Sequence, residues 1–223
     1  GVKRCVWHAS QKPLFSILDP EVTVNLPANL TAWTGCDALI HAIEAFSVPD
    51  CHPLCDGLAL EAIRLISGSL ENAVTHGDDL QARGAMLVGS CLAGISFLKG
   101  LGLVHAMSHM VGAVCDTHHG LTNAVLLPPV LLYNKEALGE KIPLMSKAMG
   151  LPSEDFDSLY SKLVELLDTL AIPRGLCELQ VPESKLDAIS EKAFTDAARS
   201  TNPVPSTVSE IRELLGQSFV NAR

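Results

Sequence analysis

Two pairs of residues in this sequence have the types and the spacing needed to hold a metal ion. Asp37 and His41 are four residues apart, and His105 and His109 repeat that spacing. Residues at positions i and i+4 of an α-helix lie on one face, so each pair would project two side chains from one rigid element. A carboxylate combined with imidazole nitrogens suits Zn²⁺, Fe²⁺ or a similar ion and leaves a coordination position for water or a substrate oxygen.

Two adjacent histidines, His118 and His119, follow shortly after the second pair. Most of the histidines lie in sequence that is otherwise apolar and helical in pattern. A buried polar group without a partner costs about 1–3 kcal/mol, and either metal coordination or an ordinary hydrogen bond would remove this cost. The spacing alone therefore leaves a metal site and hydrogen-bonded core histidines as open alternatives.

Three other motifs give weaker evidence of a functional site. The loop Cys51–Cys55 contains two thiols and an imidazole, but a structural zinc site needs four ligands and no matching CxxC motif follows. Cys115 and His118 could form a nucleophilic pair, although Cys115 lies in an apolar stretch without a clear orienting acid. The segment Gly100–Gly102 lacks the third glycine and the preceding strand of a phosphate-binding loop.

Helices must position these residues, because apolar residues recur at three- and four-residue intervals through most of the chain. Residues 1–34 are the exception. Recurring prolines and short β-leaning fragments at 14–18 and 22–24 predict an irregular or extended segment there. Helices are expected over residues 37–46, 57–73, 79–98, 104–114, 153–170, 183–200 and 208–219.

Further signals concern helix ends and helix contacts. Three glycines at five-residue spacing within 79–98 would permit close helix packing, and this helix is predicted to be buried. Pro128 and Pro129 predict a kink or break in the apolar segment that contains them. Thr207 and Glu210 have the spacing of a capping box at the start of the last helix. Together these patterns predict an all-α helical bundle.

The composition narrows the partners and the compartment. The chain has 223 residues, 48% of them hydrophobic and 18% charged, with 16 Lys and Arg against 25 Asp and Glu and a net charge of −9. This balance argues against nucleic acid and anionic membranes as partners. No apolar stretch approaches the roughly 20 residues that cross a bilayer. Seven scattered cysteines indicate a reducing compartment, so we expect a cytoplasmic protein. A mean hydropathy of +0.27 predicts an apolar surface that faces a partner or another domain.

Several sequence blocks resemble the C-terminal, metal-binding domain of the iron-containing (group III) alcohol dehydrogenases. The blocks follow one another in the order and spacing of that family and span nearly the whole chain. The resemblance implies a helical bundle similar to the C-terminal domain of dehydroquinate synthase. The blocks are Ile17–Glu21, Leu26–Pro27, Thr34–Phe46, Leu103–His109, His119–Ala124 and, more weakly, Thr201–Pro203.

Position by position, the resemblance implies that Asp37, His41, His105 and His119 bind one divalent metal, with Fe²⁺ expected and Zn²⁺ as the alternative. His109 matches a family histidine near the nicotinamide and the substrate, so it is the expected catalytic residue.

Three departures from the family pattern bear on these expectations. His118 stands where many members have proline, so we expect it outside the ligand set. Phe97–Lys99 replace the usual small residues and Asn in a segment one residue shorter than the family pattern. Family members also begin with an α/β nucleotide-binding domain that carries a Gly-Gly-Gly-Ser motif. We therefore expect residues 1–34 to be the entry segment from a missing N-terminal domain and residues 35–223 to be the metal-binding domain.

The resemblance implies an NAD(P)-dependent enzyme that interconverts a small alcohol and its aldehyde or ketone, with the metal as Lewis acid. NAD(P) would bind through the missing domain, this chain alone would be inactive, and a homo-oligomer is expected from family habit. One alternative is a stand-alone metal-binding helical domain without nucleotide chemistry. Metal-dependent hydrolysis is a further alternative, but no general base is evident near the predicted ligands.

Overall fold

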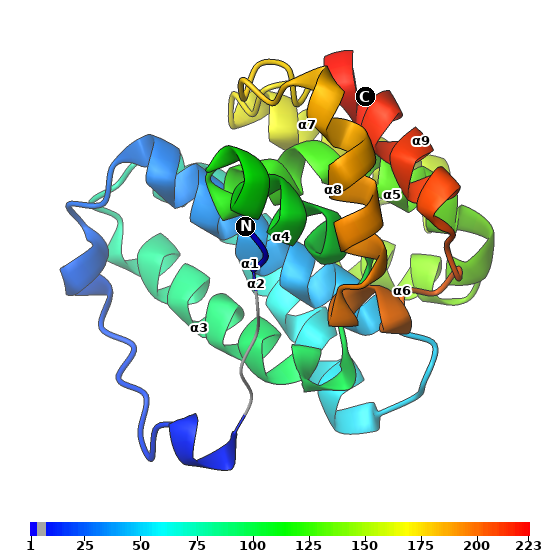
Figure 1. Ribbon diagram of the computed structural model, residues 1–223. Coiled ribbons are helices and arrows are strands. Elements are labelled where there is room, and N and C mark those ends of the chain that lie inside the picture. Colours follow the sequence, from blue (N-terminus) through cyan, green and yellow to red (C-terminus); the bar gives the residue numbers. More distant parts are fainter. Residues whose placement is uncertain (4–7) are drawn as a thin grey trace.

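The computed structural model describes residues 1–3 and 8–223, and every regular element in this part of the chain is a helix (Figure 1). The prediction of an all-α bundle is confirmed. Cys5 lies outside the described residues, and the other six cysteines are free thiols. The α-helices are α1 (Ala28–Ser47), α2 (Pro53–Thr75), α3 (Leu80–Ser96), α4 (Leu103–Cys115), α5 (His119–Leu138), α6 (Lys141–Ala148), α7 (Phe156–Thr169), α8 (Leu186–Phe194) and α9 (Val208–Val220).

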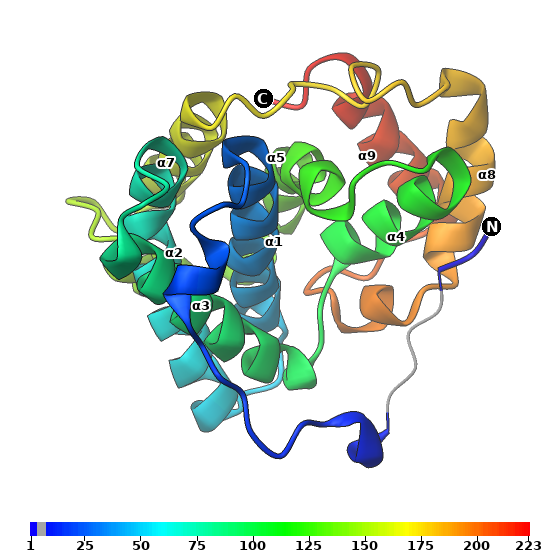
Figure 2. The same ribbon diagram turned by 90° about the vertical axis from the view of Figure 1, so that its left-hand side faces the viewer.

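Helix α1 lies in the middle of the bundle. It packs against α2 and α3 on one side and against α5 on the other, and Figure 2 shows it between these groups. Pro27 stands at its N-cap, and its C-cap Val48 precedes Pro49, a position that disfavours further helix. Buried apolar residues such as Ile40 and Ile43 recur at helical spacing along it. The core of the protein therefore holds α1 in place on several sides.

The N-terminal segment differs from the extended structure expected for residues 1–34. Pro20–Thr23 forms a 3-10 turn, η2, whose Asp19 carboxylate accepts a hydrogen bond from the Glu21 amide at 2.9 Å. Helix α1 begins at Ala28, so residues 28–34 are helical. The cause is packing, because Thr31 and Ala32 in this part of the helix are already buried against the bundle. The expectation of an extended structure over residues 28–34 was wrong.

Helix α3 is only partly buried, contrary to the expectation for residues 79–98. It packs against α1 and α2 and leaves Leu80, Val88 and Ile95 40–42% exposed. Of its glycines, Gly89 serves close packing, because a Cβ there would lie 2.6 Å from the side chain of Ile66. By length and mean hydropathy (1.2), the stretch Leu80–Lys99 could cross a membrane, although core helices of globular proteins meet the same criteria.

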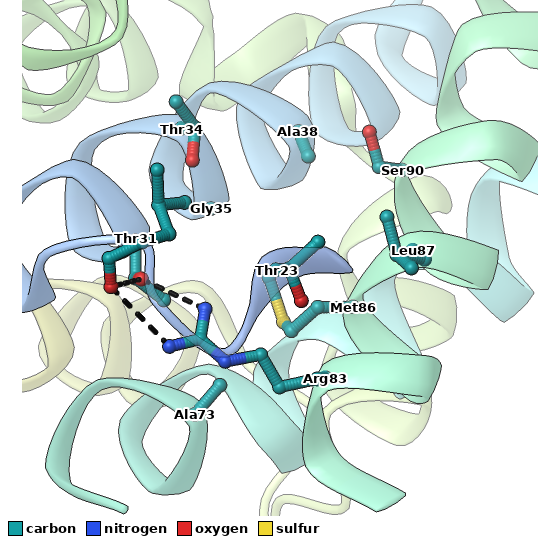
Figure 3. A pocket seen from close by; sticks show the side chains of 11 residues that line it. Thr23, Thr31, Thr34, Gly35, Ala38, Ala73, Arg83, Met86, Leu87 and Ser90 are labelled. Carbon is teal, nitrogen blue, oxygen red and sulfur yellow. Dashed lines mark hydrogen bonds between the residues drawn. The ribbon is translucent and has the colours of Figure 1, made fainter. Parts of the chain in front are cut away.

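Arg83 of α3 fastens the segment before α1 to the bundle (Figure 3). The side chain is 4% exposed and borders a cavity of about 120 Å³. Its guanidinium donates to Gly77 O at 2.7 Å, to Thr31 Oγ1 at 3.0 Å and to Leu26 O at 3.4 Å. One buried side chain thereby joins the α2–α3 loop, the start of α1 and the segment that precedes it.

Helix α5 runs without interruption through Pro128 and Pro129. Two prolines inside a helix remove two backbone hydrogen bonds at a cost of about 3 kcal/mol or more each, and a break was one expected outcome. Both rings are buried inside the bundle. This burial offsets part of the cost, and the chain leaves the helix only at Gly139, which has a φ of +32°.

The C-terminal part confirms the capping box and divides one expected helix. The side chains and backbone amides of Thr207 and Glu210 are hydrogen-bonded reciprocally at the start of α9. The region expected as a helix over 183–200 instead contains the short α8 and a 3-10 turn, η5 (Ala197–Thr201). Asp196 separates the two, because its carboxylate accepts a hydrogen bond from Ala198 N and so starts η5.

Candidate metal centre

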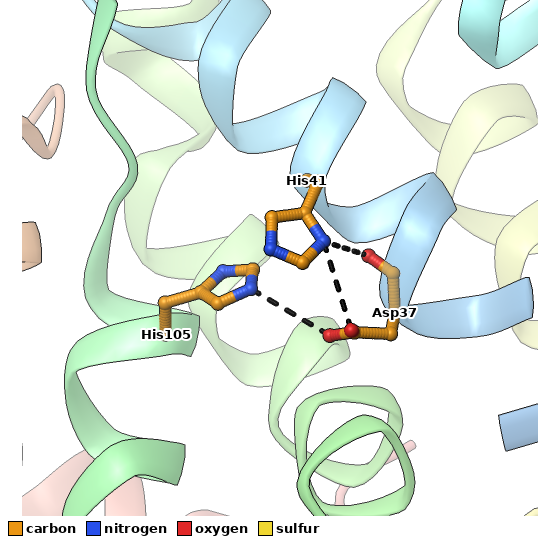
Figure 4. Close-up of side chains that lie close together, drawn as sticks. All are labelled: Asp37, His41 and His105. Atoms are coloured by element: carbon orange, nitrogen blue, oxygen red, sulfur yellow. Dashed lines mark hydrogen bonds and ion pairs between the residues drawn. The ribbon is translucent and has the colours of Figure 1, made fainter. Parts of the chain in front are cut away.

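Three side chains from two helices converge on one point beside α1. Asp37 and His41 extend from one face of α1, and His105 reaches them from α4 (Figure 4). One potential ligand atom from each lies within 4.8 Å of the other two. His105 Nε2 is 3.7 Å from Asp37 Oδ1, and His41 Nδ1 is 3.8 Å from Asp37 Oδ2. The i, i+4 spacing thus gives the shared face that it predicts.

A fourth side chain approaches from the first turn of α5. His119 Nε2 lies 3.6 Å from Asp37 Oδ1, on a ring whose centroid is 5.4 Å from that of His105. Gly120 permits this approach, because a Cβ there would lie 2.3 Å from the carbonyl oxygen of Trp33 in α1. Helices α1, α4 and α5 therefore all contribute to the same cluster.

The ring of His105 is oriented by Glu44, one turn after His41 on α1. Glu44 Oε2 accepts a hydrogen bond from His105 Nδ1 at 2.6 Å, and Oε1 accepts one from Val104 N at 2.7 Å. Both side chains are at least 94% buried. Because Nδ1 carries the proton in this bond, Nε2 is the nitrogen left to face Asp37.

The other two rings are held through Nδ1 in the same way. His41 Nδ1 donates to Asp37 O at 2.8 Å, the backbone carbonyl four residues earlier. Ser108 Oγ donates to the backbone O of His105, so it can accept from His119 Nδ1 at 3.2 Å. All three imidazoles are thus held through Nδ1, as metal-binding histidines commonly are, and the Nε2 atoms of His105 and His119 face Asp37.

Asn123 of α5 places its amide among these potential ligand atoms. Its Nδ2 donates to Asp37 Oδ1 at 2.6 Å and lies 3.2 Å from Nε2 of both His105 and His119. Its Oδ1 is buried and has no hydrogen-bond partner among the described residues. A partly buried carboxylate and imidazole nitrogens approach one point, and such a donor set fits a divalent cation.

The charges of the metal-free cluster follow from its burial and its hydrogen bonds. Burial alone would raise the pKa of Asp37, but its hydrogen bond with His105 and the neighbouring histidines hold that pKa well below its usual range. Burial lowers the pKa of His41 to about 4 and that of His119 to about 3. Burial would also lower the pKa of His105, but hydrogen bonds with Asp37 and Glu44 raise it to about 9. At neutral pH the metal-free cluster therefore contains an ionised carboxylate, two neutral imidazoles and a protonated His105, whose Nε2 proton a bound cation would displace.

His109 lies beside the cluster without joining it. Its ring stacks on that of His119 with centroids 5.3 Å apart, and its Nδ1 is bonded to Asp196 Oδ2 at 2.9 Å. It borders a cavity of about 320 Å³ whose other walls are Phe97–Leu101 and η5. His118 caps α5, accepting from Leu121 N, and packs on Trp33 instead of facing Asp37.

Comparisons with known proteins identify the family. Residues 31–219 match the Fe-containing alcohol dehydrogenase family in its C-terminal part. The chain belongs to this family. It is 38% identical over 212 residues to probable alcohol dehydrogenase EutG of Escherichia coli, a match that covers 95% of this chain and 54% of that protein. It is 39% identical over 214 residues to 1,3-propanediol dehydrogenase of Citrobacter freundii, covering 93% of this chain and 55% of that protein.

Solved structures give the same result. The crystal structure of a 1,3-propanediol oxidoreductase superposes with a TM-score of 0.87 at 38% identity, covering 90% of this chain and 55% of that one. An alcohol dehydrogenase from Oenococcus oeni gives a TM-score of 0.85 at 31% identity, with 90% and 54% covered. The chain thus spans about half the length of the relatives that it matches.

Four polar residues of this candidate metal centre were not predicted from the sequence. The spacing in the sequence could have predicted Glu44 and Asn123, because each lies one helical turn after a predicted ligand and on the same face. Ser108 lies three residues after His105 in the same manner. No spacing pattern predicts Asp196, because only the packing of η5 on α4 brings it to His109. The thiols of the loop Cys51–Cys55 form no group of three ligands among the described residues.

Proposed function

We propose that this chain is the metal-holding part of an enzyme that interconverts a small alcohol and its aldehyde or ketone with NAD(P). The chain belongs to the iron-containing alcohol dehydrogenase family, and its relatives include proteins named 1,3-propanediol dehydrogenase and NAD-dependent methanol dehydrogenase. The observation that carries the proposal is the convergence of His105 Nε2 and His119 Nε2 on Asp37 Oδ1, while each ring is held through Nδ1.

The proposed metal ligands are Asp37, His41, His105 and His119, through a carboxylate oxygen and three Nε2 atoms. Such a set suits Fe²⁺ or Zn²⁺, and we propose Fe²⁺ on the habit of the family. A bound divalent ion would supply Lewis acidity at the substrate oxygen. Glu44 and the other Nδ1 partners keep the rings oriented toward one point, which lowers the reorganisation needed on binding.

The substrate chain would lie in the cavity beside His109. Its walls include Phe97, Leu98 and Leu101, which favour the apolar part of an alcohol and exclude water from the reacting end. His109 borders this cavity and the neighbouring one that His119 lines. We assign His109 the role of receiving the substrate hydroxyl and passing its proton toward solvent.

The nucleotide would bind to a part of the enzyme beyond this chain, because the relatives are nearly twice as long. In this proposal residues 1–34 connect that part to the metal-binding domain, and this chain alone is inactive. The exposed apolar side chains of α3 and of residues 14–18 would face the other domain or a second copy in a cytoplasmic homo-oligomer.

A stand-alone metal-binding domain is the second candidate function. The observation in its favour is that all four proposed ligands and their Nδ1 partners lie within this chain. Calorimetric titration with NADH distinguishes the two only in the complete protein. Binding there supports the dehydrogenase, and its absence supports the stand-alone domain.

The adjacent histidines of α5 provide a matched test of the ligand set. In the complete enzyme, His119→Ala should abolish stoichiometric metal and alcohol oxidation together. His118→Ala removes the cap of α5 and a contact with Trp33 but no proposed ligand, so it should retain both with a modest loss of stability, about 1 kcal/mol. Metal content by atomic emission decides the question. Retention of one metal per chain by His119→Ala would overturn the assignment.

A further inference from the structure

The carboxylate of Asp196 is fixed from two directions. Its Oδ1 accepts a hydrogen bond from Ala198 N at 2.8 Å, and its Oδ2 is bonded to His109 Nδ1 at 2.9 Å. The side chains of Asp196 and His109 are only 8% and 6% exposed. Both oxygens are thus used, one by the backbone and one by the imidazole.

The segment that carries Asp196 is anchored on α4, the helix that carries His109. Thr201 Oγ1 accepts from Leu101 N at 3.1 Å, and Asn202 Oδ1 accepts from Leu103 N at 3.1 Å at the start of α4. Figure 2 shows α8 and the turn after it lying along α4. Asp196 therefore keeps a defined position relative to His109.

This contact decides which nitrogen of His109 carries the proton. An ionised carboxylate only accepts hydrogen bonds, so Nδ1 must be the protonated nitrogen of the neutral ring and Nε2 must carry the lone pair. Among the described residues, Nε2 of His109 makes no hydrogen bond. It is available to a ligand in the cavities that His109 borders.

We propose that Asp196 is a positioning residue that fixes the ring of His109 in the tautomer with Nε2 as hydrogen-bond acceptor for the hydroxyl of the alcohol. That the ligand is an alcohol rests on the proposed function. The tautomer itself depends only on the contact between Asp196 and His109. In the opposite tautomer, Nε2 would present an N–H to the hydroxyl and could not accept from it.

Asp196→Asn is the discriminating substitution. Asn is as good a helix cap as Asp, so its Oδ1 retains the bond to Ala198 N and η5 stays in place. The amide nitrogen then faces His109 Nδ1 and donates to it, which inverts the tautomer. Asp187→Asn on α8 is the matched control, because Asp187 is 82% exposed and pairs with Arg212 on the surface.

Long-range ¹H–¹⁵N spectra of the Zn²⁺-loaded chain report the tautomer directly. We expect a protonated Nδ1 in the wild type and in Asp187→Asn, and a protonated Nε2 in Asp196→Asn. An unchanged tautomer in Asp196→Asn overturns the inference, whether or not the chain belongs to an active dehydrogenase.

Kinetics of the complete enzyme test the consequence. A carboxylate-to-amide change that inverts a catalytic histidine should lower kcat by about 10²-fold or more, with metal content and KM little changed. An inverted tautomer with unchanged kcat overturns the role given to His109 and Asp196. A complete enzyme that oxidises no alcohol overturns the proposed function, and the spectra then still decide whether Asp196 positions His109.

Discussion

Glu44 Oε2 and His105 Nδ1 are 2.6 Å apart in a contact that joins the last turn of α1 to the first turn of α4. The same carboxylate accepts from Val104 N, so it holds the ring of His105 and the start of the helix that carries it. A side chain without direct access to substrate thereby determines where a proposed metal ligand points.

Glu44→Gln should weaken metal binding without unfolding the protein. The glutamine amide can donate to His105 Nδ1, which places the ring proton on Nε2, the proposed ligand atom. Loss of such an orienting partner typically costs about 10–100-fold in metal affinity, and we expect a change of that size in the Kd for Zn²⁺ by calorimetry. Glu61→Gln, on the surface of α2, is the control. Equal affinity in the two variants would contradict the orienting role.

The metal-free protein should be most stable near pH 6.5. Hydrogen bonds raise the pKa of His105 to about 9 against its burial, so the folded state binds more protons than the unfolded state between 6.5 and 9, and stability falls as pH rises there. Burial lowers the pKa of His41 to about 4 and of His119 to about 3, so stability also falls as pH drops below 6.5.

Urea unfolding of chelator-treated protein between about pH 5 and pH 9 measures this dependence. His105→Gln should remove the decline on the alkaline side. A free energy of unfolding that keeps rising up to pH 9 would show that His105 is neutral in the folded state.

Two glycines of α3 should respond in opposite directions to substitution by alanine. At Gly89 a Cβ would lie 2.6 Å from Ile66, and Gly89→Ala should destabilise the protein by about 1–3 kcal/mol. At Gly94 no atom lies within 4 Å, so Gly94→Ala should stabilise it by about 0.5–1 kcal/mol through helix propensity. Thermal unfolding of both variants provides the comparison. Similar shifts in Tm would mean that α3 and α2 are not in close contact at Gly89.

Arg64 of α2 and Arg83 of α3 should differ sharply in their contribution to stability. Arg83→Ala removes a buried guanidinium and its hydrogen bonds to Gly77 O, Thr31 Oγ1 and Leu26 O, and we expect a loss of about 1–3 kcal/mol. Arg64→Ala breaks a pair with Glu61 on the surface and should have no measurable effect. Chemical denaturation tests both, and a tolerated Arg83→Ala would refute its fastening role.

The sequence predicts the fold and part of the site because local rules govern both. Helical periodicity places Asp37 and His41 on one face of α1, and the structure has them there. The meeting of His105 and His119 with Asp37 depends on the packing of α4 and α5, which spacing does not encode, so the family resemblance had to supply the expected set. The start of α1 at Ala28 was missed because three early prolines suggested extended chain, whereas tertiary burial determined the outcome.

The segments of this chain should differ strongly in how well they tolerate insertions and deletions. In α1, Asp37, His41 and Glu44 share one face while Ile40 and Ile43 fill the core. One residue added within the helix before Asp37 would rotate everything beyond it by about 100°, so the cluster and the core would be lost in the same step. The length of α1 is therefore fixed, whereas the connection between α6 and α7, residues 149–155, contains no buried residue and can absorb such changes. Natural variation in length among related chains should concentrate there and be absent from the first two turns of α1.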